Sequence, residues 1–249
     1  MSASIKLISL NIERSLHLDL VLPFLKEQQA DVVCLQELSE PDISLFESEL
    51  GSKCVFAPMI YHHSDTGSKP VINGNAVLTR LPLQSSMINY YVGDGKKIHD
   101  EPPGYIPDHE ALVMVETDNE KGGDVFRIMT THFTWTPDGS PSDAQRRDMK
   151  KLLHVLETLG EFVLAGDFNA PRGGEIFSML AQKYKDNVPP HYVTSLDQKL
   201  HRAVKLRPHE IVDKMVDGIF STPSYTVSDV EMVSGLSDHC ALVATVSKV

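Results

Sequence analysis

The sequence predicts an α/β (α+β) fold in which helices are interleaved with the strands of mixed β-sheets. A strand, a helix and a second strand follow one another in residues 5–37, which is the order of a crossover unit. One long amphipathic helix follows Ser142, and short apolar strands continue to the end of the chain. Because no linker, internal repeat or low-complexity tract divides these elements, we predict a single domain over residues 1–249.

Composition limits the function. The 249 residues are 41% hydrophobic and 23% charged, which is enough for a large packed core. Lys and Arg total 23 against 34 Asp and Glu, so the net charge of −11 excludes a broadly basic nucleic-acid surface and leaves only a local basic rim.

Cellular location is inferred from two features of the chain. The N-terminus has no basic segment followed by an apolar one, and no apolar run is long enough to be a transmembrane segment. Cys34, Cys54 and Cys240 are an odd number without metal-site spacing. Thiols in apolar runs suit a reducing compartment, so we predict a cytoplasmic protein.

The first crossover unit places two polar residues at strand ends. Ile5–Leu10 alternates as a strand and ends on Asn11. A helix with Pro23 in its first turns runs to about Gln29. Asp31 then opens the apolar strand VVCLQ, which ends on Glu37. If these strands are parallel, Asn11 and Glu37 reach the same edge of the sheet.

The next segments are weaker. We predict a short helix over Pro41–Leu50 and a weak strand over Val55–Pro58. Residues 62–70 form an exposed loop whose paired histidines suit a solvated turn better than a metal site. Asn75–Thr79 and Ser85–Tyr91 are expected as neighbouring strands joined by a turn at Leu81-Pro82.

A long loop and a hairpin follow. Gly93–Asp108 is rich in glycine, proline and charge, and it is long enough to cover a site. Ala111–Val115 and Val125–Thr131 form a predicted hairpin. The hairpin begins just after Glu110 and ends on His132.

The clearest helix is expected over Ser142–Leu159. Ser142 and Gln145 match a capping box, and a leucine-rich stripe marks the buried face. Four basic residues lie in its first half, and a solvated face explains them better than a binding site: Arg146, Arg147, Lys150 and Lys151.

The stretch FVLAGDFNA, residues 162–170, is the centre of the prediction. Phe162–Ala165 reads as a buried strand. Residues two apart on a strand point the same way, so Asp167 and Asn169 would project together with Phe168 turned into the core. A carboxylate and an amide there can hold a water or a hard cation. A plain Asp/Asn turn is the alternative interpretation.

The last third continues the alternation. A helix over Glu175–Tyr184 and a polar loop over Asn187–Pro208 precede three strands, Val216–Phe220, Tyr225–Val233 and Cys240–Val246. Asp217 opens the first of these strands. Ser237-Asp238-His239 stands just before the last.

Polar residues therefore gather at strand ends. In a mixed sheet, the amino end of an antiparallel strand shares a rim with the carboxyl end of its neighbour. One rim could thus collect the whole polar set, as expected at a hydrolytic metal site. Oxygen ligands without cysteine favour Mg²⁺, Mn²⁺ or Ca²⁺ over zinc. The set is Asn11, Glu37, Glu110, His132, Asp167, Asn169, Asp217, Asp238 and His239.

The order of the motifs LN, LQE, THF, GDFN, DGIF and SDH resembles the endonuclease/exonuclease/phosphatase (DNase I-like) superfamily. Each motif alone is weak, but the resemblance runs from LISLNI to SDHCALV. It implies a four-layer α-β-β-α sandwich of two packed mixed sheets. It also implies a Mg²⁺-dependent phosphoesterase, with a phosphodiesterase or nuclease favoured.

The resemblance also implies roles for the matching residues. Glu37 would be the main metal ligand, with Asn11 and Asp238 beside it. Asp167 would orient or deprotonate the attacking water, and Asn169 would hold that water or a phosphoryl oxygen. His239 would contact the scissile phosphate, with Asp217 fixing its tautomer and favouring its charge. His132 would bind the phosphate from the other side, with Glu110 as its carboxylate partner. Asn75 would support the site and the substrate.

Substrate and mechanism class stay open at this level. The substrate is expected to be a phosphodiester, either single-stranded or nicked nucleic acid held by Lys96, Lys97, Arg146 and Arg147, or a small-molecule or lipid phosphoester. A non-catalytic binding module should have lost Glu37, Asp167 or His239, and all three are present. Gly218, where many relatives carry a bulkier residue, leaves the local packing in question. The sequence indicates no protein partner.

Overall fold

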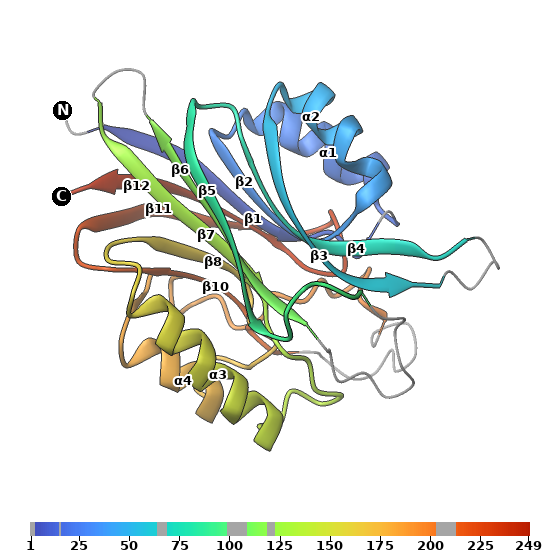
Figure 1. Ribbon diagram of the computed structural model, residues 1–249, viewed down its shortest axis with the longest axis vertical. Helices are drawn as coiled ribbons and strands as arrows, with labels where there is room; N and C mark the ends of the chain where they lie inside the picture. Colours follow the sequence, from blue (N-terminus) through green and yellow to red (C-terminus); the bar gives the residue numbers. More distant parts are fainter. Residues whose placement is uncertain (1–2, 15, 64–68, 99–108, 119–122, 203–212) are drawn as a thin grey trace.

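Two six-stranded sheets lie face to face in the computed structural model, with α1 and α2 on one outer side and α3 and α4 on the other (Figure 1). The model describes residues 3–14, 16–63, 69–98, 109–118, 123–202 and 213–249. The predicted four-layer sandwich is therefore confirmed.

The first sheet has the strand order β11-β12-β1-β2-β4-β3. Its parallel pair, β1 and β2, is joined by α1 (Leu18–Gln28), and its other pairs are antiparallel. After β2, a 3₁₀ turn at Glu40–Asp42 leads into α2 (Ile43–Leu50). The strands are β1 (Ser4–Asn11), β2 (Val32–Ser39), β3 (Lys53–His62), β4 (Val71–Thr79), β11 (Tyr225–Val233) and β12 (Ala241–Lys248).

The second sheet, in the order β5-β6-β7-β8-β10-β9, repeats this plan. Its parallel pair, β7 and β8, is joined by α3 (Asp143–Leu156), and α4 (Glu175–Ala181) packs beside α3. The strands are β5 (Leu83–Val92), β6 (Glu110–Asp118), β7 (Val125–His132), β8 (Val163–Asp167), β9 (Lys185–Asp186) and β10 (Asp217–Ser221). The two halves share an architecture without a sequence repeat.

Three apolar layers hold the four structural layers together. The middle layer lies between the sheets and includes Leu7, Cys34 and Val113. A second layer packs the first sheet on α1 and α2, and a third packs the second sheet on α3 and α4. Because strand residues alternate, each sheet sends its odd and even positions to different layers. This alternation decides which polar residues at the strand ends can meet.

Two sequence predictions about strands need correction. Asn75–Thr79 and Ser85–Tyr91 are strands, but β4 lies inside the first sheet and β5 on the edge of the second. The turn at Leu81-Pro82 therefore crosses between the sheets. β3 is also longer than its apolar core Val55–Pro58, since it pairs with β4 up to His62.

The other expected segments are close to the prediction. Pro23 lies inside α1, and α3 ends at Leu156 rather than Leu159. Residues 93–98 and 187–201 contain no helix or strand apart from an isolated bridge at Leu196. Parts of the predicted loops, residues 64–68, 99–108, 119–122 and 203–212, lie outside the described residues. Among the described residues, every helix is too short or too polar to cross a membrane.

Gly218 has a packing reason. A Cβ there would lie 2.9 Å from the Phe220 ring and 3.2 Å from the Phe168 ring. These rings meet edge to face with centroids 5.1 Å apart. The glycine thus makes room for an aromatic contact under the site.

Gly166, in β8, allows a closer approach between strands. A Cβ at this position would lie 2.1 Å from the carbonyl oxygen of Thr131 in β7, which cannot move without breaking the β7–β8 pairing. We expect Gly166→Ala to lower the free energy of unfolding by on the order of 2–4 kcal/mol, measured by urea denaturation.

Gly51→Ala is the matched control for this substitution. Gly51 has open space around it and a φ of 61°, so only backbone strain opposes a methyl group. We expect a loss of about 1 kcal/mol. Equal losses in the two variants would contradict the steric argument.

Candidate active site

One rim of the sandwich collects the polar ends of the central strands. Asn11, His132 and Asp167 are the last residues of β1, β7 and β8, and Asp217 is the first of β10. His132 and Asp217 are the direct strand partners of Asp167. His239 lies just before β12, bridged to Leu196.

The Asp167 carboxylate is the centre of this rim. Its side chain is 1% exposed, and three nitrogen atoms converge on its Oδ2 atom. The Asn11 Nδ2 atom lies 3.2 Å away, the His132 Nε2 atom 3.4 Å and the His239 Nε2 atom 3.6 Å. A buried carboxylate with this surrounding is held in a fixed orientation by groups from both sheets.

His239 is fixed from its other side by Asp217. The His239 Nδ1 atom lies 2.7 Å from Asp217 Oδ2, and both side chains are buried. Burial opposes a charge on the imidazole. The carboxylates of Asp217, Asp167 and Asp238 outweigh burial and raise the pKa of His239 well above its usual 6.5. The raised pKa favours the charged form of the ring, whose Nε2 atom lies 3.6 Å from Asp167 Oδ2.

Ser195 supports this pair from a loop that has no regular structure. Its Oγ atom accepts the backbone N–H groups of Val216 and Asp217, both at 3.1 Å. Its carbonyl accepts the N–H of Cys240 at 2.7 Å. The loop thus ties the start of β10 to the start of β12, which positions Asp217 opposite His239.

Glu37 reaches the rim because β2 is bulged. Leu35 pairs with Ala76 and Leu38 with Gly74, so β2 has one residue more than β4 in this interval. Strict alternation would send Glu37 into the helix layer with Leu35. Instead Glu37 adopts a φ of 60°, and its Oε1 atom accepts the Asn11 Nδ2 at 3.2 Å.

Asp238 shares a crowded acidic environment with Glu37. Burial, together with the carboxylates of Glu37 and Glu13, raises the pKa of Asp238 to about 7, while His239 and a hydrogen bond from Ser237 oppose the shift. A hard cation among these carboxylates would relieve their mutual repulsion, and oxygen donors suit Mg²⁺, Mn²⁺ or Ca²⁺. Asn11 donates to Glu37 here and turns its Oδ1 to the Glu13 N–H. The donor set thus fits a divalent metal.

A second group of metal-binding atoms adjoins the first, because Asn11 contacts Asp167. One ligand atom from each of Asp167, Asp217 and His239 lies within 4.8 Å of the others, and all three residues are buried. The proton of His239 already satisfies Asp217 in this arrangement. The half-exposed Glu37, by contrast, opens to solvent, so we favour the Glu37 side for a metal.

Asn169 lies in a turn rather than in a strand. Its φ is 47°, its backbone N–H donates to Asp167 Oδ1 at 2.8 Å, and its Nδ2 donates to the Phe133 carbonyl at 2.8 Å. Gln145 supports it. The Gln145 Nε2 atom reaches the carbonyls of Thr134 and Asn169, so the predicted capping box forms only its Ser142 half.

The expected pairing of Glu110 with His132 is wrong. The carboxylate partner of His132 is Asp167, while Glu110 is hydrogen-bonded to Thr134 and faces Asp148. Residues of β6 and β7 pair as Leu112 with Thr131, so Glu110 and His132 point to opposite faces of the sheet. Burial and then Asp148 raise the pKa of Glu110 well above its usual 4.5.

Asn75 supports the site from behind. It is 1% exposed, and its Nδ2 donates to the Ala111 carbonyl at 3.3 Å, which links the two sheets next to Glu110. Asn75 is as buried as Asp167, and its predicted role at the substrate stays a prediction.

Sequence reasoning missed several residues at the rim. Arg14 lies 3.9 Å from Glu37 Oε2 through its Nε atom and contacts His62 from the end of β3. His201 lies beside His239, with ring centroids 6.4 Å apart. Burial and then the charge of His239 lower the pKa of His201 to about 4. The only hint of Arg14 in the sequence is that two charged residues, Glu13 and Arg14, follow Asn11 and Ile12.

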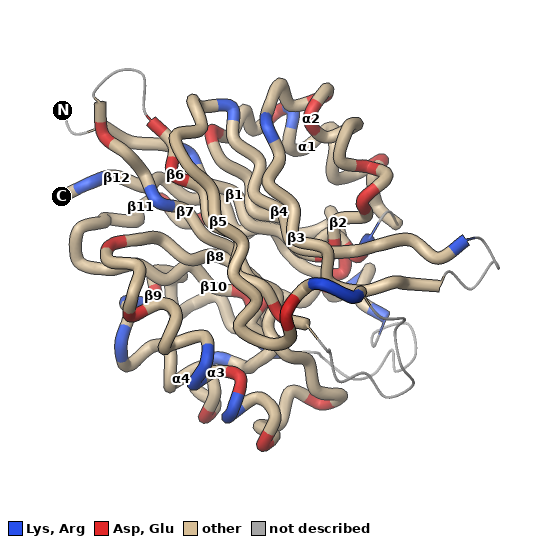
Figure 2. The backbone as a smooth tube through the Cα atoms, viewed as in Figure 1, with Lys and Arg blue, Asp and Glu red and all other residues tan. Residues whose placement is uncertain are grey.

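The basic residues named for nucleic-acid contact are mostly engaged elsewhere. Arg146 is paired with Glu175 and Asp143 on the exposed surface of α3 and α4, where Figure 2 shows both charge signs together. Arg147 pairs with Asp148. Lys96 is 84% exposed beside Asp94.

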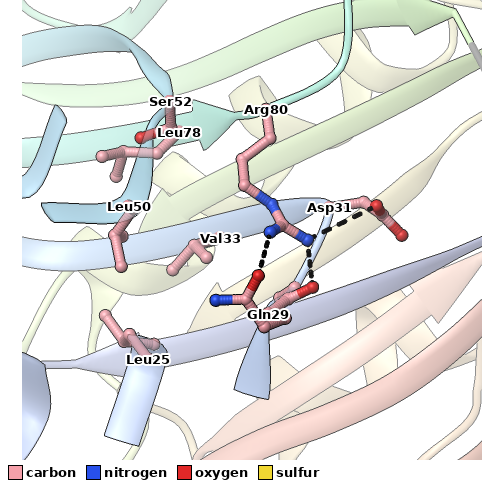
Figure 3. A pocket seen from close by; sticks show the side chains of 9 residues that line it. Leu25, Gln29, Asp31, Val33, Leu50, Ser52, Leu78 and Arg80 are labelled. Atoms are coloured by element: carbon pink, nitrogen blue, oxygen red, sulfur yellow. Dashed lines mark hydrogen bonds and ion pairs between the residues drawn. The ribbon is translucent and has the colours of Figure 1, made fainter. Parts of the chain in front are cut away.

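A hollow at the opposite end of β2 is separate from this rim. It is lined by Leu25, Val33, Leu50 and Leu78, with Arg80 held by Gln29 at its mouth (Figure 3). It has room for about one water molecule. Val33, which β2 contributes to the lining, is near the start of that strand, whereas Glu37 is near its end, so the hollow is not part of the site.

Comparison with known families gives a match over nearly the whole chain. Residues 8–239 match the model of the endonuclease/exonuclease/phosphatase family. No protein with a curated description matches the sequence significantly.

Solved structures with the same fold cover the chain almost completely. An endonuclease/exonuclease/phosphatase from Bacteroides vulgatus aligns with a TM-score of 0.73 at 16% identity, covering 100% of each chain. A mannosyl-6-phosphatase from Bacteroides thetaiotaomicron aligns at 0.69 and 12% identity, covering 97% of this chain and 99% of that one. ANGEL2, a 2′,3′-cyclic phosphatase, aligns at 0.69 and 15% identity, covering 99% and 96%.

The Asp217–His239 pair predicts a measurable titration. We expect the imidazole pKa of His239 to lie well above 6.5 and to fall in Asp217→Asn, because burial then opposes the charge with less compensation. NMR of the histidine ring protons measures both values, with the exposed His154 as a reference in the same spectra.

The sign of the linked stability change follows. The folded-state pKa of His239 lies above its unfolded value of about 6.5. The resulting stabilisation of the folded protein is complete below pH 6.5, and it is lost as the pH rises through the folded-state pKa. When the pH is raised from 6.5 to the His239 pKa of the wild type, the free energy of unfolding of Asp217→Asn should therefore fall less than that of the wild type. An unchanged His239 titration would show that Asp217 does not control it.

Proposed function

The chain belongs to the endonuclease/exonuclease/phosphatase family, whose members are phosphoester hydrolases, and we propose that it is a divalent-metal-dependent phosphodiesterase that uses water as the nucleophile. The observation that carries this proposal is the convergence of Asn11, His132 and His239 on the buried Asp167 carboxylate. A binding module would have no need for a buried carboxylate faced by one amide and two imidazole nitrogens.

The metal belongs to the acidic side of the rim. Glu37 and Asp238 would hold it, with the Asn11 Oδ1 atom, which accepts the Glu13 N–H in this structure, as a further oxygen donor. Mg²⁺ is the preferred ion, with Mn²⁺ or Ca²⁺ as alternatives. Such an ion supplies charge stabilisation at a phosphoryl oxygen and lowers the pKa of water. The acid-base work on the other side of the rim falls to this chain's own residues.

Each residue near Asp167 has a distinct proposed role. Asp167 accepts a proton from the attacking water and orients it, and Asn169 holds the water or a phosphoryl oxygen. His239, charged through Asp217, donates to the phosphate as negative charge accumulates. His132 donates from the opposite side. Glu110, which faces the helix layer, affects these groups only through its proximity to Asp167.

The substrate is the least constrained part of the proposal. Two of the structural neighbours are a mannosyl-6-phosphatase and a 2′,3′-cyclic phosphatase, so a small-molecule phosphoester is the main alternative. The pairing of Arg146 with Glu175 reduces the basic surface open to nucleic acid. Three cysteines without disulfides suit a reducing compartment such as the cytoplasm.

A substrate panel tests the reaction class. Nicked and single-stranded DNA, RNA, a 2′,3′-cyclic nucleotide, a sugar phosphate, a sphingomyelin and an aryl phosphodiester should be incubated with Mg²⁺, Mn²⁺ or EDTA. Metal-dependent release of phosphate or of a phosphomonoester from at least one substrate is expected. No hydrolysis with any metal would leave only the binding-module alternative.

Hydrolysis should require both the metal and Glu37. We expect Glu37→Gln to lower kcat/KM by on the order of 10²-fold and to weaken the apparent affinity for Mg²⁺, because the variant loses a charged ligand. The matched control is Glu49→Gln, an exposed carboxylate on α2 paired with Lys26. Full activity of Glu37→Gln in EDTA would rule out the metal model.

Asp167→Asn should separate chemistry from binding. The substitution keeps the size of the side chain and removes the base, so kcat should fall by on the order of 10²–10⁴-fold while substrate affinity changes little. Asp143→Asn, at a fully solvated position, serves as control. Circular dichroism checks the fold, since Asp167 is buried. Normal turnover with weakened binding would make Asp167 a binding residue.

A further inference from the structure

Arg14 occupies a place on the rim that the proposed chemistry does not use. Its Nε atom lies 3.9 Å from Glu37 Oε2, while the Asn11 amide occupies the other oxygen of that carboxylate. Asn11 in turn contacts Asp167. Among the contacts of the described residues, Glu37 and Asn11 therefore link Arg14 to Asp167.

The guanidinium is oriented by a residue from the other side of the first sheet. Its Nη1 atom lies 2.6 Å from His62 Nε2. A guanidinium can only donate, so this imidazole nitrogen must accept and carries no proton. His62 is the last residue of β3, and β3 and β4 extend beyond the other strands of their sheet (Figure 1). The β3–β4 extension thus fixes Arg14 over the rim.

The donors of Arg14 are not used up by the protein. Its Nε atom has no hydrogen-bond partner among the described residues, but it is enclosed, so a ligand would meet the terminal Nη atoms of the 30% exposed side chain. Both carboxylates near it, Glu37 and Glu13, are 3.9 Å from guanidinium nitrogens, which is beyond hydrogen-bond distance. A planar fork of N–H donors fits the oxygens of a phosphate or carboxylate.

The backbone that presents Arg14 is strained. Glu13 and Arg14 are consecutive non-glycine residues with φ of 44° and 65°, in the left-handed region. The Asn11 Oδ1 atom accepts the Glu13 N–H at 3.0 Å and holds the turn. Strain that persists beside an active rim motivates a functional role for the side chain it presents.

We infer that Arg14, held by His62, binds a second anionic group of the substrate, so that this enzyme selects phosphoesters that carry another phosphate or carboxylate beside the scissile one. The inference rests on the proposed function for the scissile site but concerns a separate contact. The rival explanation is that Arg14 only neutralises Glu37, and the experiment separates the two.

The test compares ligands that differ by one phosphate. Isothermal titration calorimetry would measure the affinity of thymidine 3′,5′-bisphosphate against thymidine 5′-monophosphate, and of fructose 1,6-bisphosphate against fructose 6-phosphate, with Ca²⁺ present. In at least one pair, the wild type is expected to bind the bisphosphate more tightly than the monophosphate. The pair that shows this difference tells whether the second anionic group is carried by a nucleotide or by a sugar. No gain in either pair overturns the inference.

Variants assign that gain to Arg14. Arg14→Gln should lose about tenfold or more in bisphosphate affinity and leave the monophosphate within about twofold, since a charge-assisted contact is removed. Arg14→Lys, which keeps the charge without the fork, should lie between. His62→Phe should give a smaller loss with Arg14 intact. Equal losses for both ligands would support the neutralising role and overturn the inference.

Arg80→Gln is the matched control. Arg80 is, like Arg14, 30% exposed in its side chain, but it lies at the far end of the sheet with Gln29 and Asp31 (Figure 3). The affinities of the Arg80→Gln variant for all four ligands should equal those of the wild type. Because the readout is binding rather than turnover, absence of hydrolysis with every phosphoester would refute the proposed function without deciding the role of Arg14.

Discussion

The buried carboxylate of Asp167 is the constraint on which the rest of the site depends. An ionised group removed from water is stable only when donors surround it. Asn11 from the first sheet and His132 from the second both face one of its oxygens, and His239 completes the set. Meeting this requirement brings the carboxyl ends of β1, β7 and β8 to one place. The carboxylate to which we assign the chemistry is thus also the one on which groups from both sheets converge at this rim.

Support for these groups comes from polar residues outside the motifs. Ser195 holds the start of β10 against the start of β12, and Gln145 holds the turn at Asn169. Asp197 accepts the N–H groups of Lys199, Leu200 and Gly235, which fixes the loop before Asp238. Each contact satisfies buried backbone groups that regular strands would have paired. Irregular segments near the rim are therefore ordered by side chains.

Backbone strain is concentrated where side chains must leave the regular pattern. Glu37, Asn169, Glu13 and Arg14 all have positive φ and all lie at the rim. Such conformations cost of order 1–3 kcal/mol each. The cost is offset by the packed strands on either side, which are buried in three apolar layers. A rigid scaffold thus permits an irregular edge.

The sequence by itself determined the order of elements, the four-layer class and the set of polar residues at strand ends. Apolar runs and helix periods are local signals, and the motif order identifies the family that supplies the rest. Tertiary structure decided which of those residues meet. Strand alternation turns Glu110 toward α3 while His132 faces Asp167. A single extra residue in β2 turns Glu37 away from the helix layer that Leu35 enters and toward the rim. Arg14 and His62 are separated by 48 positions and meet only because a strained turn and a long hairpin approach each other. Register, bulges and long-range pairing are cooperative properties of the packed sheets, so no local pattern in the sequence contains them.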